Sequence, residues 1–162
     1  IIKDVVENES CLKDYVFTSG GIGPTHDDIT AEAIASTFDV PLLVRDDAVE
    51  LLAMHYRNGK KDLNAARLRM ARIPEGASLI KNKVSGAPGF VIKNVYVMAG
   101  VPEVFEAMVQ EIILDLGSVL LKLSVSYKSS NEFPDQKISS NSLSSFFNCL
   151  ILSIFVTITF HE

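Results

Sequence analysis

The chain has few of the residues that build metal or disulfide frameworks. Its 162 residues include two cysteines and three histidines, all widely separated. Cys11 and Cys149 stand in no metal-ligand spacing, so neither a zinc site nor a disulfide framework is indicated, and a reducing compartment fits better. Lys3, Asp4 and Glu7 interrupt any apolar run at the N-terminus, so no signal peptide is indicated and the cytoplasm is the expected location.

An excess of basic charge is also lacking. The formal net charge is −5 and the isoelectric point is about 5.2. This argues against a nucleic-acid partner, because proteins that bind nucleic acid normally present a basic face. It does not exclude a small anionic ligand, since backbone N–H groups bind phosphate without net positive charge. The length fits one domain, and an apolar share of 48% is enough for a packed core.

Short apolar runs alternate with segments of helical periodicity. The run at 14–19 ends at a glycine pair and reads as a buried strand, and 28–38 then shows one apolar helical face with Thr30 as its expected N-cap. This alternation predicts an α/β domain with a largely parallel sheet covered on both faces. A short link or strand is expected at 41–44, and further strands at 89–92 and 95–99. Further helices are expected at 1–11, 46–56 (with Asp46 as its cap), 64–72 and 103–116.

The composition changes at Gly117. Eleven of the sixteen serines and only six charged residues lie in the last 45 residues. We therefore assign 1–117 to one domain and leave 118–162 unassigned, with a further strand expected at 118–127. The uncharged segment 143–160 could be a membrane span, although it falls short of about 20 apolar residues, or a buried or aggregation-prone strand. The third interpretation, an out-of-frame end, is favoured by the sharp change in composition.

The loop from Thr18 to Thr30 is the most informative stretch. Its three glycines allow a sharp turn and a close approach of the backbone to a ligand. The N–H groups and partial positive charge at the start of the next helix suit an anion. Asp27 and Asp28 would repel phosphate unless a divalent cation such as Mg²⁺ bridged them to it. A tight turn with a helix cap is the alternative interpretation. The third glycine of a dinucleotide-binding fingerprint and the Gly-Lys-Ser/Thr of a P-loop are both absent.

The sequence Ser-Gly-Gly-Ile-Gly-Pro-Thr-His-Asp-Asp-Ile-Thr at 19–30 resembles the signature loop of the molybdopterin-binding (MoaB/Mog) family. It is most similar to the CinA-like branch. The resemblance covers about two-thirds of the chain, in the family's order, and continues through 67–71, 73–76, Asn82, 87–90 and 100–103.

The resemblance implies a three-layer α/β/α fold, with the glycine loop and the loop at 100–103 together at the C-terminal edge of a mostly parallel sheet. It implies that these loops bind a pterin phosphate or a nucleotide. Asp28 is similar to the family's acidic residue beside the reacting phosphate, with Asp27 as its neighbour, and is the expected ligand of Mg²⁺ or another divalent cation. The implied ligand contacts are Ser19, Gly20, Gly21, Gly23, Pro24, Thr25, Thr30, Ala87, Pro88, Gly89, Gly100, Val101, Pro102 and Glu103.

Several of these residues also have a purely structural interpretation. Gly100–Pro102 could be a strand-to-helix turn, and Glu103 could simply complement the dipole of the helix that it begins. His26 is interpreted first as a loop residue and only second as a catalytic residue. The arginines could clamp phosphate, but their spacing favours a solvated helix face; they are Arg67, Arg69 and Arg72.

Three functions follow from the resemblance. The first is binding of a pterin phosphate in molybdenum cofactor biosynthesis, where a family member transfers AMP to the pterin phosphate. The second is CinA-type hydrolysis of a nucleotide diphosphate such as ADP-ribose or FAD. The third is an inactive fragment, because the strand and helix that normally open the family's domain are not seen before Asp14. The expected partner is a small molecule, with no nucleic acid and no membrane; related proteins are often homo-oligomers, so self-association is one expectation.

Overall fold

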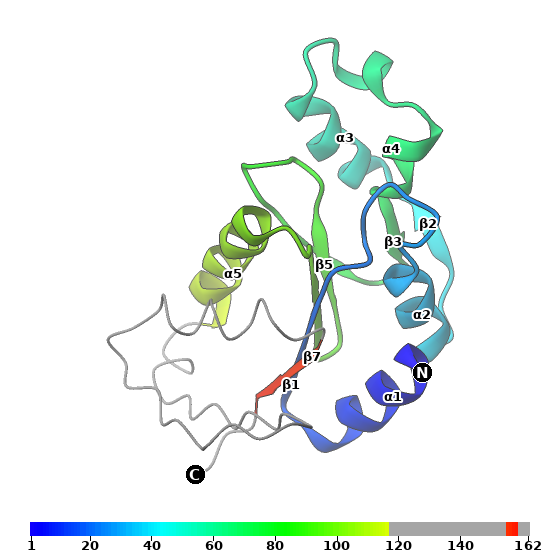
Figure 1. The fold of residues 1–162 in the computed structure, drawn as a ribbon, viewed down its shortest axis with the longest axis vertical. Coiled ribbons are helices and arrows are strands. Elements are labelled where there is room, and N and C mark those ends of the chain that lie inside the picture. The colour runs from blue at the N-terminus through cyan, green and yellow to red at the C-terminus, as the bar shows by residue number, and fades with distance from the viewer. Residues whose placement is uncertain (117–154, 159–162) are drawn as a thin grey trace.

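A five-stranded sheet forms the centre of the molecule (Figure 1). The structure is a computed structural model, and it describes residues 1–116 and 155–158. The strands lie in the order β4–β5–β6–β1–β7. Their bounds are Tyr15–Ser19 for β1, Ser78–Ile80 for β4, Gly89–Ile92 for β5, Val95–Met98 for β6 and Phe155–Ile158 for β7.

The sheet is mixed. β1 and β6 pair in parallel, with Val16 opposite Val95 and Ser19 opposite Met98, so their carboxyl ends meet at one edge. The expected parallel pairing is therefore present at this position. The pairs β4–β5, β5–β6 and β1–β7 are antiparallel. The β5–β6 pair is a hairpin because only Lys93 and Asn94 separate the strands, and Lys93 takes a left-handed φ of 52° there.

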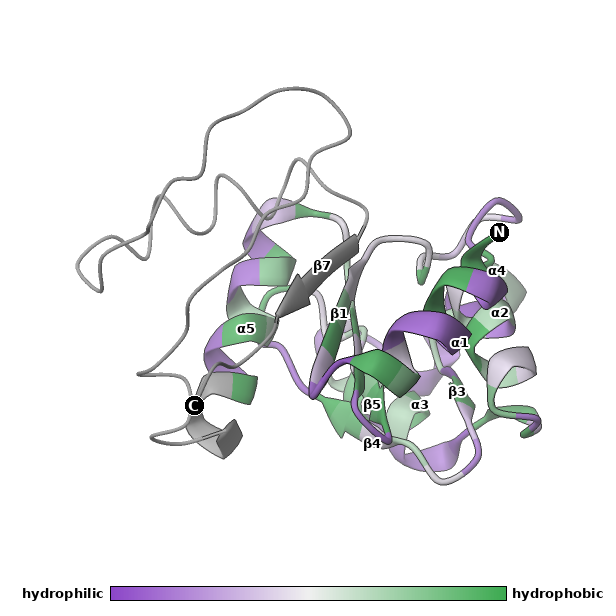
Figure 2. Cartoon of the chain, turned by 90° about the horizontal axis from the view of Figure 1, so that it is seen from below, coloured by the Kyte–Doolittle hydropathy of each residue, from purple (hydrophilic) through white to green (hydrophobic). Residues whose placement is uncertain are grey.

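Helices cover both faces of the sheet, which confirms the α/β class and its three layers. Figure 2 shows α5 (Pro102–Leu116) on one side of the strands and α1 (Ile2–Leu12) and α2 (Thr30–Thr37) on the other. Alternation along β1 divides the core, since Val16 packs toward α1 and α2 whereas Phe17 packs toward α5. The α5 layer buries Met98, Phe105, Met108 and Ile112, and the opposite layer buries Val6, Ala31, Ile34, Val95 and Val97.

A mainly helical segment, residues 42–74, lies between α2 and β4 in the chain. The two-stranded antiparallel sheet of β2 (Leu42–Val44) and β3 (Arg72–Pro74) closes its base. Within it lie α3 (Asp46–His55), the 3-10 turn η1 (Gly59–Asp62) and α4 (Ala65–Arg69). The side chain of Asn64 caps α4 by accepting a hydrogen bond from the amide of Arg67 at 2.9 Å. Figure 1 shows α3 and α4 of this segment at the top of the view, away from β7 and α1.

The structure corrects several local predictions. Thr30 is the first residue of α2 rather than its N-cap, which is Ile29. Arg45, not Asp46, precedes α3, and no side chain caps that helix. The helix expected at 64–72 ends at Arg69, because Arg72 already pairs with Val44 in the β2–β3 ladder.

Two strands of three residues, β3 and β4, were not predicted because such short segments show no measurable alternation. The strand expected at 118–127 lies outside the described residues. Within 143–160 only β7 is described, paired with β1. Within the described part of the chain, no helix is long and apolar enough to cross a bilayer.

Candidate functional site

Two glycine turns meet where β1 and β6 end. The amide of Gly20 donates to the carbonyl of Met98 at 2.9 Å, and the hydroxyl of Ser19 donates to the carbonyl of Ala99 at 3.3 Å. A Cβ added at Gly100 would lie 3.2 Å from the Cα of Gly20. The two loops are therefore in backbone contact at the C-terminal edge of the parallel pair, as the resemblance implies.

A third predicted segment, Ala87–Gly89, reaches the same edge. β5 runs antiparallel to β6, so its first residue Gly89 lies near the end of β6. Asn82 shapes the preceding turn, because its Nδ2 donates to the carbonyl of Ala87 at 2.5 Å and its Oδ1 accepts from the amide of Ser85 at 2.8 Å. Pro88 is thereby held as one wall of the pocket described below.

Asp28 organises the interior of the glycine loop. Its Oδ2 accepts hydrogen bonds from the amide of Thr25 at 2.8 Å and from the hydroxyl of Thr25 at 2.6 Å. A Cβ added at Gly23 would lie 2.7 Å from the same oxygen, so the carboxylate occupies the space that a side chain would need. The pair Asp28–Thr25 thus holds the second half of the loop in one conformation.

The loop's own bonds decide which amides are left for a ligand. The amide of Thr30 donates to the carbonyl of Gly21 at 2.9 Å, and the amide of Asp28 donates to that of Thr25 at 3.3 Å. Together with those of Gly20 and Thr25, these amides are already bonded within the protein. In residues 1–116 no partner is recorded for the amides of Gly21, Ile22, His26, Asp27 and Ile29. Gly21 and Ile22 are the ones in the first half of the loop, where Ile22 lines the pocket described below, so they are the donors considered for a ligand.

Asp28 is held in its ionised form. Burial would raise the pKa of its carboxyl, but hydrogen bonds from the side chain and backbone of Thr25 and from the backbone of Gly23 outweigh it, and the positive charge of Arg69 adds to them. The net result is a pKa below the ordinary value of 3.8. Asp28 therefore carries a negative charge throughout the neutral range.

Asp27 does not share this environment. Its side chain is 83% exposed and pairs with Nε2 of His26 at 3.2 Å, and the His26 side chain is 91% exposed. The two residues lie on the outer side of the loop and do not line the pocket. The structure therefore separates the two predicted acidic residues, and only Asp28 faces the space that a ligand could enter.

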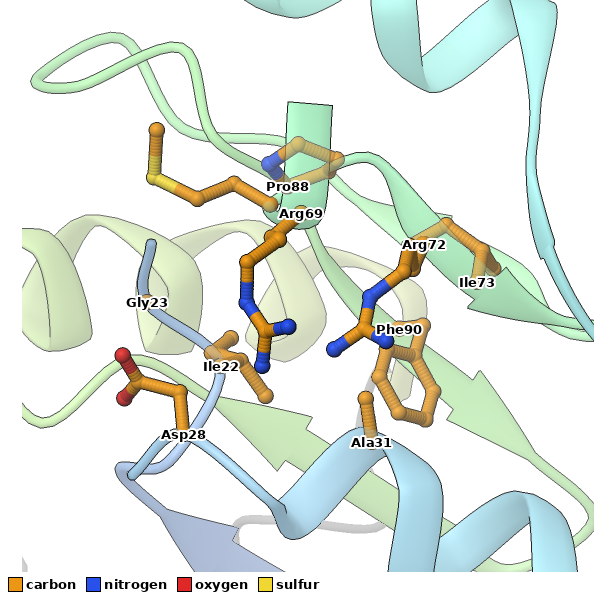
Figure 3. A pocket seen from close by; sticks show the side chains of 10 residues that line it. Ile22, Gly23, Asp28, Ala31, Arg69, Arg72, Ile73, Pro88 and Phe90 are labelled. Carbon is orange, nitrogen blue, oxygen red and sulfur yellow. The ribbon is translucent and has the colours of Figure 1, made fainter. Parts of the chain in front are cut away.

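A pocket opens beside Asp28 (Figure 3). Arg69, which ends α4, donates from Nε to the carbonyl of Thr25 at 3.2 Å. Arg72, in β3, donates from a terminal guanidinium nitrogen to Glu32 at 2.6 Å. The spacing favoured a solvated helix face for Arg67, Arg69 and Arg72. Arg67 and Arg69 do lie on α4, although Arg69 lines the pocket. For Arg72 the prediction was wrong, because the helix ends at Arg69 and Arg72 lies in β3 with its side chain only 21% exposed. The lining residues are Ile22, Gly23, Asp28, Ala31, Arg69, Met70, Arg72, Ile73, Pro88 and Phe90.

The remaining predicted contacts are not among the lining residues of this pocket. Val101, Pro102 and Glu103 are exposed at the start of α5, with Glu103 in its first turn. Thr30 is buried, and its hydroxyl lies where a Cβ of Gly21 would fall. Gly21 itself has φ of +70°, a conformation that favours glycine.

Comparison with known proteins decides the family. Residues 1–118 match the family described as a probable molybdopterin binding domain. The chain belongs to this family.

Similar proteins include archaeal and bacterial relatives. A protein of Archaeoglobus fulgidus is 36% identical over 113 residues, covering 70% of this chain and 47% of the relative. A CinA-like protein of a Sulfurihydrogenibium species is 37% identical over 101 residues, covering 59% of this chain and 25% of the relative. The crystal structure of CinA from Thermoplasma acidophilum, a protein of unknown function, superposes with a TM-score of 0.65 at 33% identity, covering 72% of this chain and 70% of that one. The chain thus spans less than half the length of these curated relatives.

At this site of the molybdopterin-binding-type domain, Asp28 offers one carboxylate to a metal ion. In the part of the chain that the structure describes, no group of three His, Cys, Asp or Glu side chains could enclose a metal ion. Mg²⁺ is commonly held by one or two carboxylates together with water and ligand phosphates. Both donors from Thr25 fall on Oδ2 of Asp28. The residues present therefore fit a cation shared with a bound phosphate rather than a cage made by the protein alone.

Proposed function

We propose that the domain binds the phosphate group of a pterin phosphate at the edge where β1 and β6 end. The observation that carries this proposal is the position of Asp28, an ionised carboxylate in a loop whose Gly21 and Ile22 amides have no recorded partner within the described chain, next to the guanidinium group of Arg69. An acid held in this way beside amide and cationic donors suits a ligand that combines an anion with a cation.

The two amides and the positive end of α2 would bind the phosphate oxygens. Asp28 would hold Mg²⁺ against the same phosphate, and the ion would neutralise charge that otherwise repels the ligand. Apolar lining residues such as Ile22 and Pro88 would exclude water, which strengthens the electrostatic contacts in the pocket. No protein carboxylate other than Asp28 is needed for this arrangement.

The similarity to CinA-like proteins favours a second candidate, hydrolysis of a nucleotide diphosphate such as ADP-ribose or FAD. The same loops would bind the diphosphate. Asp28, already deprotonated, would serve as the metal ligand rather than as the acid that protonates the leaving group. Both candidates therefore depend on Asp28 and differ in whether the ligand is cleaved.

One experiment separates them. The purified chain is titrated calorimetrically with a pterin phosphate, with and without Mg²⁺, and is incubated with ADP-ribose or FAD plus Mg²⁺, Mn²⁺ or Co²⁺ while AMP is measured. Saturable, Mg²⁺-dependent pterin phosphate binding without AMP release supports the first candidate, and AMP release that Asp28→Asn abolishes supports the second. A protein that binds and cleaves none of these compounds would contradict both.

A further inference from the structure

Two arginines share the pocket beside the glycine loop. Figure 3 shows the guanidinium groups of Arg69 and Arg72 turned into it, with Asp28 on the side of Arg69. Arg69 ends α4 and Arg72 begins β3. Arg69 lies within the stretch 67–71 that shares the family resemblance, whereas Arg72 lies outside the stretches that carry it. Like charges in one pocket repel each other, so each needs a negative group nearby.

Each arginine side chain makes one hydrogen bond within the protein, and the other N–H donors of its guanidinium group have no recorded partner in the described chain. Arg69 uses Nε for the carbonyl of Thr25, and no other bond of its side chain is recorded in the described chain. Arg72 uses one terminal nitrogen for Glu32 on α2. The side chain of Arg72 is only 21% exposed, so its geometry is restrained by its surroundings.

The Nε of Arg72 is the decisive atom. It is buried, and among the described residues it has no hydrogen-bond partner. A buried guanidinium N–H without an acceptor is unfavourable, because it has lost water and gained nothing in exchange. It belongs to a side chain that lines the pocket, so a ligand in that pocket is the candidate acceptor.

We infer that Arg69 and Arg72 bind a second anionic group of the ligand, a phosphoryl or carboxylate group, next to the phosphate held by the glycine loop. This inference rests on the proposed function, which supplies the first phosphate. Arg72 donates through Nε and the terminal nitrogen not used by Glu32, in the planar fork that matches two oxygens of one anion. Arg69 donates through its terminal nitrogens. Arg72 thus contacts the ligand and determines specificity for compounds with two negative groups.

Glu32 has a positioning role. It holds one terminal nitrogen of Arg72 at 2.6 Å, which directs the opposite edge of the guanidinium toward the pocket. The local charges already balance, since Asp28 and Glu32 face Arg69 and Arg72. A ligand that brings two anions therefore fits best when it also brings a divalent cation, which agrees with a metal shared between Asp28 and phosphate.

The test compares three small probes in the presence of Mg²⁺: inorganic phosphate, pyrophosphate and phosphonoacetate. The first carries one anionic group, the second carries two phosphoryl groups, and the third pairs a phosphonate with a carboxylate. Dissociation constants are measured by calorimetry for the full chain and for Arg72→Gln, Arg72→Lys, Asp28→Asn and Arg67→Gln. Arg67 is the matched control, because it precedes Arg69 on α4 but its guanidinium lies over the Tyr56 ring, 4.3 Å from the ring centroid, outside the pocket.

We expect wild type to bind at least one two-anion probe more tightly than phosphate. Arg72→Gln should reduce that preference by roughly ten- to a hundredfold, the range of one or two lost charge-assisted hydrogen bonds. Arg72→Lys should restore little of it, because an ammonium group cannot serve Glu32 and the ligand through separate nitrogens. Arg67→Gln should leave it unchanged. The probe whose preference falls more, pyrophosphate or phosphonoacetate, shows whether the second group is phosphoryl or carboxylate.

The outcomes separate this inference from the proposed function. A preference unchanged in Arg72→Gln, or fully restored in Arg72→Lys, overturns the assignment of Arg72 and leaves phosphate binding at the loop intact. A preference for the two-anion probes that falls in Arg72→Gln but not in Asp28→Asn overturns the glycine loop as the phosphate site. The arginine pair then remains as an anion-binding site. Failure of wild type to bind any probe overturns both. Circular dichroism and thermal melting confirm that each variant is folded.

Discussion

Oδ2 of Asp28 accepts two hydrogen bonds from Thr25, one from its amide at 2.8 Å and one from its hydroxyl at 2.6 Å. The carboxylate thereby occupies, within the loop, the place that an external anion would take in a simple amide cradle. The loop is ordered by its own acid, and the donors without a recorded partner next to the pocket are the amides of Gly21 and Ile22. A ligand phosphate would meet both these amides and a negative charge, which is why a shared cation belongs to the proposed mode of binding.

Replacing Asp28 by Asn tests that arrangement. Asn keeps the shape and one acceptor oxygen, so we expect the free energy of unfolding to fall by only about 1 kcal/mol. The Mg²⁺ dependence of phosphate affinity should disappear, because the charge that would hold the ion is gone. Calorimetry with and without Mg²⁺ measures this. Asp27→Asn, isosteric and in the same loop but paired only with His26, is the control and should keep wild-type behaviour.

The pH dependence of stability gives a second test of Asp28. Its pKa in the folded protein lies below the ordinary 3.8, so the ionised form stabilises the fold. That contribution is fully present above about pH 4 and is lost as the pH falls through the lowered pKa. The difference in melting temperature between wild type and Asp28→Asn should therefore be constant from pH 5 to 8 and shrink below pH 4. The comparison with the variant is needed because the pKa values of Asp47 and Asp62 are lowered as well.

The sequence alone predicts the architecture well because the large elements carry strong local signals. The apolar face of residues 103–116 and the strand that ends at the Gly20–Gly21 pair are both found, as α5 and β1. The hairpin β5–β6 was anticipated as two strands but not as an antiparallel pair, since the direction of pairing depends on the two-residue turn at Lys93 rather than on alternation. Where a signal spans only three residues, as in β3, prediction failed.

Only part of the candidate site can be predicted from the sequence. Glycine spacing predicts where the backbone turns, but it cannot show which amides are consumed internally, because that depends on how Asp28 folds back on Thr25. Arg72 was misplaced for a related reason: helical periodicity was extended past residue 69, although Pro74 is an available sign of strand or turn structure. Contacts between segments some 40 residues apart, such as Arg72 with Glu32, have no local signal at all.

Gly23→Ala tests how closely the loop packs around its acid. The added Cβ would lie 2.7 Å from Oδ2 of Asp28, so the carboxylate must move and weaken its bonds to Thr25. We expect a loss of about 1–3 kcal/mol in the free energy of unfolding. Denaturant titration of wild type, Gly23→Ala, Asp28→Ala and the double variant that combines the two substitutions completes a double-mutant cycle. The loss caused by Gly23→Ala should be smaller when Asp28 is already absent, and equal losses in both backgrounds would contradict this packing.

Gly89 and Gly100 separate a structural role from a ligand role among the residues predicted to bind. Gly89 is buried, and a Cβ there would overlap the carbonyl oxygen of Val97 in the neighbouring strand and approach the sulfur of Met108 to 3.2 Å. Neither obstacle is easily relieved, because a strand carbonyl and a core side chain are both fixed by packing. Gly89→Ala should therefore lower the melting temperature strongly, with a loss of about 3 kcal/mol or more.

Gly100 is exposed, and its added Cβ would meet only the backbone of Gly20, at 3.2 Å from Cα. A shift of a few tenths of an ångström at this edge relieves the contact, so Gly100→Ala should change the melting temperature little. That shift nevertheless separates the two turns between which the ligand is proposed to bind, and phosphate affinity should fall several-fold. Thermal melting and calorimetry on the two variants measure both effects. A Gly100→Ala variant with full affinity, or one that melts as early as Gly89→Ala, would show that contact between the turns is not what shapes the site.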